Sequence, residues 1–260
     1  MGVGRTKKTD VSNEAAQAKL GAGHHHEAYR VAAQIAEKAF TELDYGAMPA
    51  PLRIMQQARA AIREKAVASG HVYLISGDIP VSPSGVKPGC YLVQPPRVGV
   101  DGRAIREMAD ENHVPALVIV REPTTRDGAW PVVTIGPATI RTRIEPPDAA
   151  EPSGKAKGKA KPDPSTVPDA GGAQALPSPQ WFVEAAHSLA QTGIEQAKPE
   201  GSTAARVEAL YLRTQAHPDG DALFAALIEA CVQAAKEPKA AVRPRKPVFD
   251  EEDEDLGELG

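Results

Sequence analysis

Three consecutive histidines, His24–His26, form the most conspicuous group of chemically active side chains in the sequence. Adjacent imidazoles can bind divalent transition metals. On a helix, however, consecutive side chains point about 100° apart, so three in a row do not converge on one ion. No cysteine or carboxylate pair follows at metal-ligand spacing. We therefore interpret the cluster as the solvated start of a helix, and we predict no metal site and no cofactor.

A second polar group flanks an apolar run, residues 116–120, that is typical of a central strand. Asp110, Glu111 and His113 precede this run, and Glu122 follows it. Catalytic groups often gather at the end of a sheet strand, and carboxylates beside a histidine would suit a metal-dependent nuclease. Charged residues at the end of a short helix are also common, and the spacing matches no established motif. An enzyme acting on nucleic acid is therefore an alternative hypothesis.

Arginines around the later strands are the candidate nucleic-acid contacts. Arg141 and Arg143 are two residues apart in an alternating segment, so they share one face of the predicted strand. Arg121 and Arg126 extend the positive charge toward the preceding hairpin. Proteins that bind single strands add exposed aromatic side chains for base stacking. The few tyrosines and tryptophans nearby also fit a hydrophobic core, so a solvated strand face is the competing interpretation.

One further segment lacks two catalytic motifs that its residue types could suggest. The glycine- and proline-rich segment 76–89 lacks the Gly-Lys-Ser/Thr ending of a phosphate-binding loop and leads into a strand. Ser82 and Ser84 do not lie in the Gly-x-Ser-x-Gly turn that exposes a nucleophilic serine. We interpret this segment as a surface loop.

Candidate protein contacts lie in the C-terminal third. Trp181 and Phe182 begin an amphipathic helix, and we predict that they contact a protein partner. Residues 250–260 hold seven acids and no base, which predicts an electrostatic regulator and a second protein contact. The acidic residues in this prediction are Asp250, Glu251, Glu252, Asp253, Glu254 and Asp255.

Composition limits the class of protein. The 260 residues have a net charge of −4, and the body without the acidic tail is weakly basic, which would suit an anionic partner. Two distant cysteines, Cys90 and Cys231, form neither a disulfide framework nor a zinc site, and they suit a reducing compartment. The first residues contain no apolar signal segment, and no apolar run approaches the roughly 20 residues of a membrane span. We expect a cytoplasmic protein that is not inserted in a membrane.

The pattern of apolar residues predicts an α+β domain followed by a small all-α helical bundle, with a disordered linker and tail. Helices are indicated at 24–43 and from Pro51 to Gly70, and a short helix capped by Asp101 at 102–112. Strands are indicated by β-type runs at 72–75, 91–93, 116–120, 130–135 and 138–144.

Five segments follow from this pattern. We predict a disordered N-terminus at 1–23, the α+β domain at 24–146, a disordered Lys/Pro-rich linker at 147–177, the helical bundle at 178–237, and a disordered basic-then-acidic tail at 238–260. The linker has too few large apolar residues to offset its ordering entropy, so we expect the two folded regions to move as separate bodies. Its lysines are as well explained by solubility as by contact with phosphates.

The leading hypothesis is a non-enzymatic binding or adaptor protein with a flexible tether and an acidic regulatory tail. Two folded regions on one tether raise each other's effective concentration at a shared target. We expect a protein partner at the helical bundle and tail, and nucleic acid is the candidate partner of the α+β domain. The alternatives are the metal-dependent enzyme described above and a structural or assembly subunit. The oligomeric state stays open.

Overall fold

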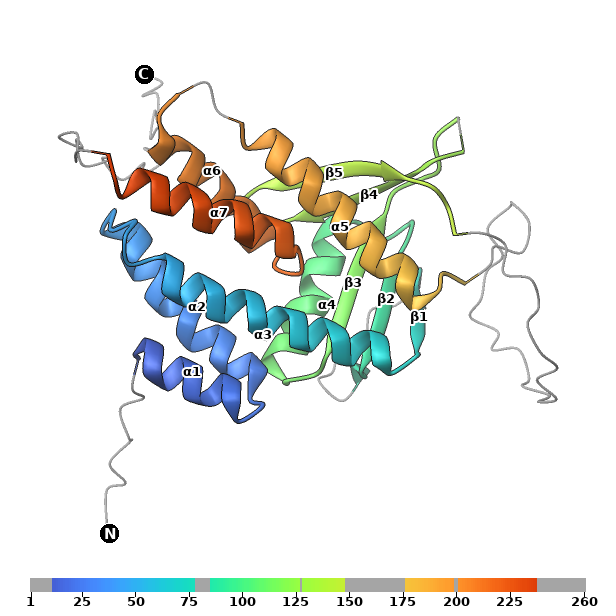
Figure 1. Cartoon of the computed structure of the whole chain (residues 1–260). Helices are drawn as coiled ribbons and strands as arrows, with labels where there is room; N and C mark the ends of the chain where they lie inside the picture. Colours follow the sequence, from blue (N-terminus) through green and yellow to red (C-terminus); the bar gives the residue numbers. More distant parts are fainter. Residues whose placement is uncertain (1–10, 78–84, 127, 148–175, 199–200, 238–260) are drawn as a thin grey trace, which may run out of the picture.

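The structure, a computed structural model, describes residues 11–77, 85–126, 128–147, 176–198 and 201–237 (Figure 1). Nearly all of the predicted linker and the whole predicted tail lie outside these described residues. The described part comprises a mixed sheet with helices and then further helices, which is the coarse arrangement predicted from the sequence. Among the described residues, no helix is both long and apolar enough to cross a membrane.

Three helices precede the sheet: α1 (Asn13–Gly21), α2 (His25–Thr41) and α3 (Pro49–Ala68). The first corrects the predicted disorder of residues 1–23, because Ser12 caps α1 by accepting a hydrogen bond from the Ala15 N–H at 3.1 Å. This helix has no broad apolar stripe, so periodicity did not reveal it.

The sheet has five strands in the order β1-β2-β3-β4-β5. The first three are parallel to one another, and β4 and β5 continue the sheet antiparallel. Their bounds are β1 (Val72–Ile75), β2 (Gly89–Val93), β3 (Ala116–Arg121), β4 (Trp130–Ile135) and β5 (Thr139–Ile144). The antiparallel β3–β4 pair is a hairpin, and its connection contains Asp127-Gly128, a dipeptide typical of hairpin turns, although Asp127 itself lies outside the described residues.

Helix α4 (Gly99–Glu111) covers one face of the sheet, and its start corrects a second prediction. The sequence predicts Asp101 as the N-cap, the residue directly before the helix, but the helix begins at Gly99 and its N-cap is Val98. Asp101 lies inside the first turn and accepts a hydrogen bond from the Val98 N–H at 2.8 Å. Close packing of α4 depends on Gly102, where an added Cβ would lie 2.2 Å from the Cγ2 atom of Val120 on β3.

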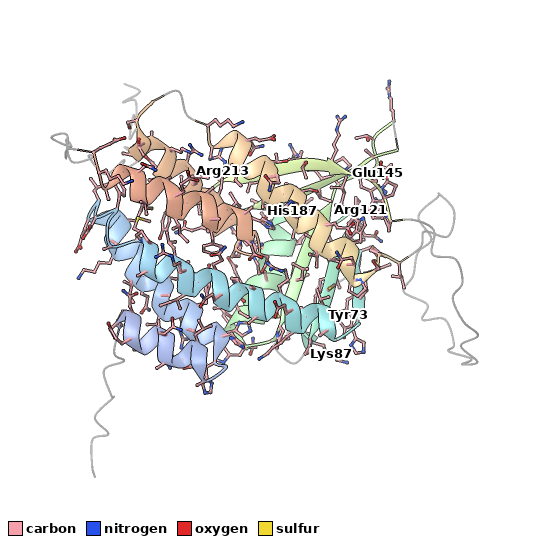
Figure 2. All side chains as sticks on the ribbon, viewed as in Figure 1. Tyr73, Lys87, Arg121, Glu145, His187 and Arg213 are labelled. Carbon is pink, nitrogen blue, oxygen red and sulfur yellow. The ribbon has the colours of Figure 1, made fainter. Side chains whose placement is uncertain are left out.

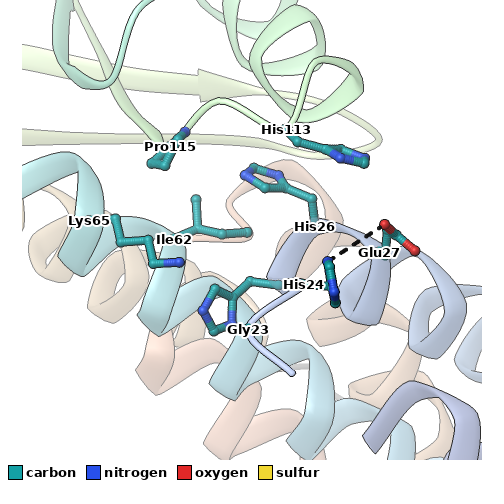
Figure 3. A pocket seen from close by; sticks show the side chains of 9 residues that line it. Gly23, His24, His26, Glu27, Ile62, Lys65, His113 and Pro115 are labelled. Atoms are coloured by element: carbon teal, nitrogen blue, oxygen red, sulfur yellow. Dashed lines mark ion pairs between the residues drawn. The ribbon is translucent and has the colours of Figure 1, made fainter. Parts of the chain in front are cut away.

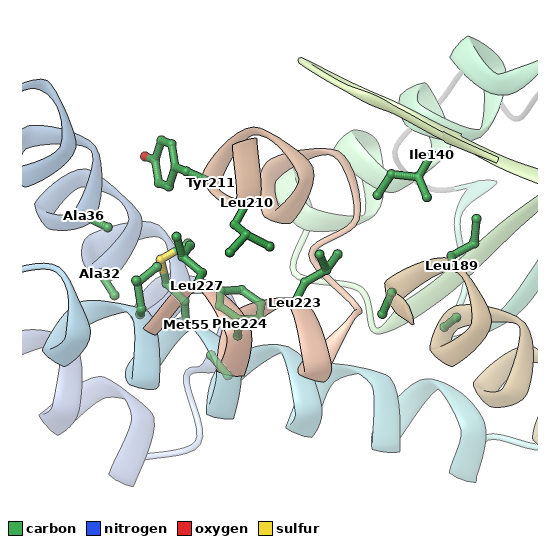
Figure 4. Packing of buried hydrophobic residues seen from close by; sticks show 14 of the residues in the cluster. Ala32, Ala36, Met55, Ile140, Leu189, Leu210, Tyr211, Leu223, Phe224 and Leu227 are labelled. Carbon is green, nitrogen blue, oxygen red and sulfur yellow. The ribbon is translucent and has the colours of Figure 1, made fainter. Parts of the chain in front are cut away.

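The opposite face of the sheet is covered by α3, α5 (Pro179–Gln196) and α6 (Thr203–Ala216). Helix α7 (Asp221–Ala234) packs on these three helices. Ser178 and Ser202 cap α5 and α6, a position at which serine is strongly preferred. One hydrophobic core runs through α2, α3, this face of the sheet and α5–α7 (Figure 4). The two regions predicted from the sequence therefore pack together, and this packing argues against their moving as separate bodies.

Candidate functional site

Two adjoining cavities form the most distinctive polar surface among the described residues. They lie between the start of α2, the side of α3 and the turn from α4 to β3, and they share the side chains of His26, Ile62 and His113. The smaller cavity measures about 140 Å³ and the larger about 330 Å³. We call the pair the histidine groove. The residues lining it are Gly23, His24, His25, His26, Glu27, Tyr29, Arg30, Ala33, Gln34, Glu37, Arg59, Ile62, Lys65, Asp110, Glu111, His113 and Pro115.

The smaller cavity opens at the N-terminus of α2. Gly23, with φ of +80°, turns the chain from α1 into α2, a conformation that suits glycine. His24 precedes the helix, and its side chain makes no capping hydrogen bond. The first N–H groups of a helix have no partner within the helix and carry a partial positive charge. The first-turn residues of α2, whose N–H groups have no side-chain cap, therefore line this cavity.

Lys65 of α3 makes the smaller cavity cationic. Its amino group reaches toward the cavity (Figure 3), and no carboxylate in the described ranges forms an ion pair with it. The only acid in the lining, Glu27, is paired with Lys19, and the hydrogen bond from Lys19 holds the pKa of Glu27 below its ordinary value. Burial and the charge of Lys65 lower the pKa of His25, so that imidazole is neutral near pH 7.

His26 lies where the two cavities meet, between Ile62 and His113 (Figure 3). Its side chain is only 10% exposed, its Nδ1 atom is 3.4 Å from the Oδ1 atom of Asp110, and its ring stacks on that of His113 with 5.5 Å between centroids. The Nε2 atom is shielded from solvent and has no hydrogen-bond partner among the described residues. A buried nitrogen without a partner is unfavourable, so the enclosed Nε2 atom of His26 is a local cost to the stability of the fold.

A buried ion pair fixes the position of Asp110. The guanidinium of Arg59, a residue that is 3% exposed, donates to both carboxylate oxygens of Asp110, and its carbon lies 4.5 Å from the centre of the Tyr29 ring. Burial alone would raise the pKa of Asp110, but the charge of Arg59 and hydrogen bonds from His26 and Arg59 hold it at about 2. Asp110 is therefore a permanent anion that orients His26 through Nδ1.

The structure assembles only part of the predicted catalytic group. Asp110, Glu111 and His113 all line the larger cavity. His113 has a φ of +56°, an uncommon value that histidine tolerates better than most residues. Glu122 follows the other end of β3, on the order of 20 Å away at the usual rise per strand residue. In the part of the chain that the structure describes, no three histidine, cysteine or acidic side chains are grouped to hold a metal ion.

The four predicted nucleic-acid contacts have different surroundings. Arg126, Arg141 and Arg143 are exposed, and Arg141 pairs with Glu122 at 2.7 Å. Arg121 is buried. Its Nε atom donates a hydrogen bond to the Oε1 atom of Gln94 at 3.1 Å. Its guanidinium lies 4.6 Å from the centre of the Trp130 ring. Figure 2 shows Arg121 near the end of the sheet where Glu145 lies. The prediction is therefore wrong for Arg121, because this side chain is part of the core packing.

The predicted protein contacts of the helical segment are also internal. Phe182 is fully buried and Trp181 is 8% exposed. Trp181 packs edge-on against Trp130 and donates through Nε1 to the carbonyl oxygen of Glu145 at 3.2 Å. These side chains join α5 to the sheet, so they offer almost no surface to a partner. Residues 250–255 lie outside the described residues.

Sequence reasoning missed the roles of His26, Arg59 and Lys65. One signal was available: Arg59 lies between Met55 and Ile62 at helical spacing, within the apolar stripe of α3. A charged residue in such a stripe needs a buried partner of opposite charge. Nothing in the sequence identified Asp110 as that partner.

No protein-family model, curated protein sequence or solved structure matches the chain. The function of the groove is therefore argued from its geometry.

Proposed function

We propose that this chain is a non-enzymatic binding protein of the adaptor type, and that its folded part engages an anionic partner at the histidine groove. The observation that carries the proposal is the smaller cavity, which combines the uncapped N-terminus of α2 with the amino group of Lys65. Helix N-termini bind anions because their N–H groups and the helix dipole both favour negative charge.

Sequence features outside the described residues support an adaptor. The segment 147–177 has the proline- and lysine-rich composition of a tether, and residues 250–260 hold seven acids. We propose that this acidic tail competes with an anionic partner for the smaller cavity beside Lys65. Arg126, Arg141 and Arg143 remain a proposed second contact area, since Arg126 follows the end of β3 and the other two lie on the edge strand β5.

The test uses a fluorescent single-stranded oligonucleotide as the polyanion and the full chain, with binding followed by anisotropy at several salt concentrations. We expect Lys65→Gln to weaken binding and to reduce the salt dependence by about one phosphate contact. Lys38→Gln is the matched control, because Lys38 lies near the other end of α2 and, among the residues that the structure describes, forms its ion pair with Glu42. The proposal fails if the oligonucleotide does not bind at low salt, or if Lys65→Gln behaves like Lys38→Gln.

Removal of residues 250–260 tests the tail in the same assay. We expect tighter binding, because the deletion removes seven carboxylates that compete with the oligonucleotide. Unchanged affinity would remove the regulatory role of the tail from the proposal.

A further inference from the structure

The first strand of the sheet, β1, is an edge strand, and β2 is the one described element with which it has extensive contact (Figure 1). The Cys90 N–H of β2 donates to the carbonyl oxygen of His71 at 2.9 Å. In a parallel pair every second residue bonds to the neighbouring strand, so the N–H and C=O groups of Val72 and Leu74 point away from β2. Among the described residues these outward-facing groups have no hydrogen-bond partner.

Apart from being short, β1 lacks the features with which proteins usually protect an exposed edge, namely charged residues, prolines and bulges. The opposite edge strand, β5, carries Arg141 and Arg143, whereas β1 has the sequence Val-Tyr-Leu-Ile and pairs with β2 without a bulge. Leu74 is 46% exposed, and it is the one exposed large hydrophobic residue in the described strands. An uncharged, apolar edge of this kind suits another strand as its neighbour.

We propose that β1 pairs with β1 of a second copy of this chain, antiparallel about a two-fold axis at Tyr73. In this register Val72 lies opposite the partner's Leu74, and Leu74 lies opposite the partner's Val72. Hydrogen-bonded residues of an antiparallel pair exchange both N–H···O bonds. The copy therefore satisfies the outward-facing N–H and C=O groups of Val72 and Leu74, and the two sheets become continuous. The inference goes beyond the proposed function and does not depend on it.

The side chains of β1 are self-complementary in the same register, as a two-fold contact requires. Tyr73 lies opposite the partner's Tyr73 at a position without hydrogen bonds, where the two Cα atoms are about 4.5 Å apart. Its ring stacks on that of Tyr91 in β2 with 4.8 Å between centroids, so the partner's ring extends this row across the axis. On the other face, the exposed Leu74 is covered by the partner's Val72. No like charges meet, because β1 contains none.

The contact is small, so we expect a weak and reversible dimer. A pair of four-residue strands buries much less than the roughly 1,200 Å² of a standard interface. Sedimentation velocity of the full chain should show a monomer at about 1 μM and a dimer at several hundred μM, with a Kd on the order of 10–100 μM. Backbone and apolar contacts resist screening, so the dimer should persist at about 0.5 M salt, unlike an association through the acidic tail.

A charge on the edge tests the surface. Leu74→Lys alters an exposed side chain and should weaken dimerisation at least about tenfold. Val232→Lys is the matched control, because Val232 is also exposed and lies on α7, which has no extensive contact with β1. Unchanged dimerisation in Leu74→Lys, or equal loss in both variants, overturns the inference. Lys65→Gln, which tests the proposed function, should leave dimerisation unchanged, so the two proposals fail independently.

Disulfide trapping tests the register. In Tyr73→Cys the two introduced thiols lie directly opposite each other, with Cα atoms about 4.5 Å apart, within the range of a disulfide. In Leu74→Cys the two thiols are diagonal and farther apart. With copper phenanthroline as the oxidant, we expect a covalent dimer of Tyr73→Cys and none of Leu74→Cys, and the native Cys90 and Cys231 are buried. No trapping at position 73, or preferential trapping at position 74, overturns the inference.

Amide exchange of the unaltered chain distinguishes a second copy from any other occupant of this edge. The Val72 and Leu74 N–H groups should exchange rapidly in the monomer and become protected as the protein concentration rises. The Tyr73 N–H, which faces β2, should be protected throughout. Protection of Val72 and Leu74 that is already complete in the monomer would assign the edge to another part of the chain. That result, or rapid exchange at every concentration, overturns the inference.

Discussion

Among single residues, Arg59 has the largest influence on the shape of the groove. Its guanidinium is buried, lies against Tyr29 and is satisfied by Asp110, which in turn lies beside Nδ1 of His26. Loss of one member of a buried ion pair is costly, because it leaves the other charge without compensation. The chain of contacts therefore links the stability of the fold to the orientation of the central imidazole.

Asp110→Asn tests this link. We expect the free energy of unfolding at pH 7 to fall by on the order of 3 kcal/mol, because Arg59 keeps its charge and loses the carboxylate. Glu111→Gln is the matched control: this neighbour is exposed and forms no ion pair within the described ranges, so its effect should stay within about 0.5 kcal/mol. Urea unfolding measures both, and equal stability of the two variants would contradict the account.

The same pair predicts a pH dependence. The folded pKa of Asp110 is about 2, below the value of about 3.9 for a free aspartate. The ion pair therefore stabilises the fold fully above about pH 4, and this contribution is lost as the pH falls through about 2. The stability difference between the wild-type chain and Asp110→Asn should narrow between pH 5 and pH 2. A constant difference over this range would contradict the assignment.

At the level of elements, the sequence predicted long periodic segments well. The helices α2 and α3, the strand β3 and the caps of α5 and α6 follow from apolar spacing and from serines at helix starts. The groove did not follow, because His26, Arg59 and Asp110 are separated by 33 and 51 positions and meet only through tertiary packing. Burial of Trp181 and Phe182 was missed for the same reason, since an amphipathic face does not identify what covers it.

The contact between the β4–β5 turn and the end of α6 gives an element-level prediction. A Cβ added at Gly136 would lie 2.7 Å from the Cα atom of Ala216, and backbone atoms cannot give way as a side chain can. Thr134 also donates to the carbonyl oxygen of Ala216 at 2.6 Å. We expect Gly136→Ala to reduce the free energy of unfolding by about 1–3 kcal/mol.

Gly21→Ala is the control for this change. Gly21 ends α1, and an added Cβ meets nothing within 4 Å. Its replacement should be neutral or stabilising by up to about 1 kcal/mol, because alanine restricts the unfolded chain and favours helix. Thermal unfolding compares the two, and a neutral Gly136→Ala would show that α6 does not pack on this turn.

At the level of the whole molecule, one hydrophobic core connects the sheet with α5–α7, and polar contacts reinforce it. Arg63 of α3 pairs with Asp221 of α7, and His217 Nε2 lies 2.8 Å from the carbonyl oxygen of Ala186. Such shared packing predicts cooperative unfolding of the described helices and strands.

The two cysteines report on this cooperativity. Cys90 lies in β2 and Cys231 in α7, both are fully buried, and burial raises the pKa of each thiol to about 12. Both should therefore be unreactive toward thiol reagents in the native state and become reactive at the same denaturant concentration. Labelling of Cys231 well before Cys90 would show that the helices detach from the sheet first.

The central claim is that an anionic group binds at the uncapped N-terminus of α2, and amide chemical shifts test it most directly. In a titration of the full chain with the single-stranded oligonucleotide, we expect saturable shifts of the His25, His26 and Glu27 N–H signals. The first-turn amides of α6, which Ser202 caps, should not move. Shifts that are absent at residues 25–27, or that persist unchanged in Lys65→Gln, would contradict the claim.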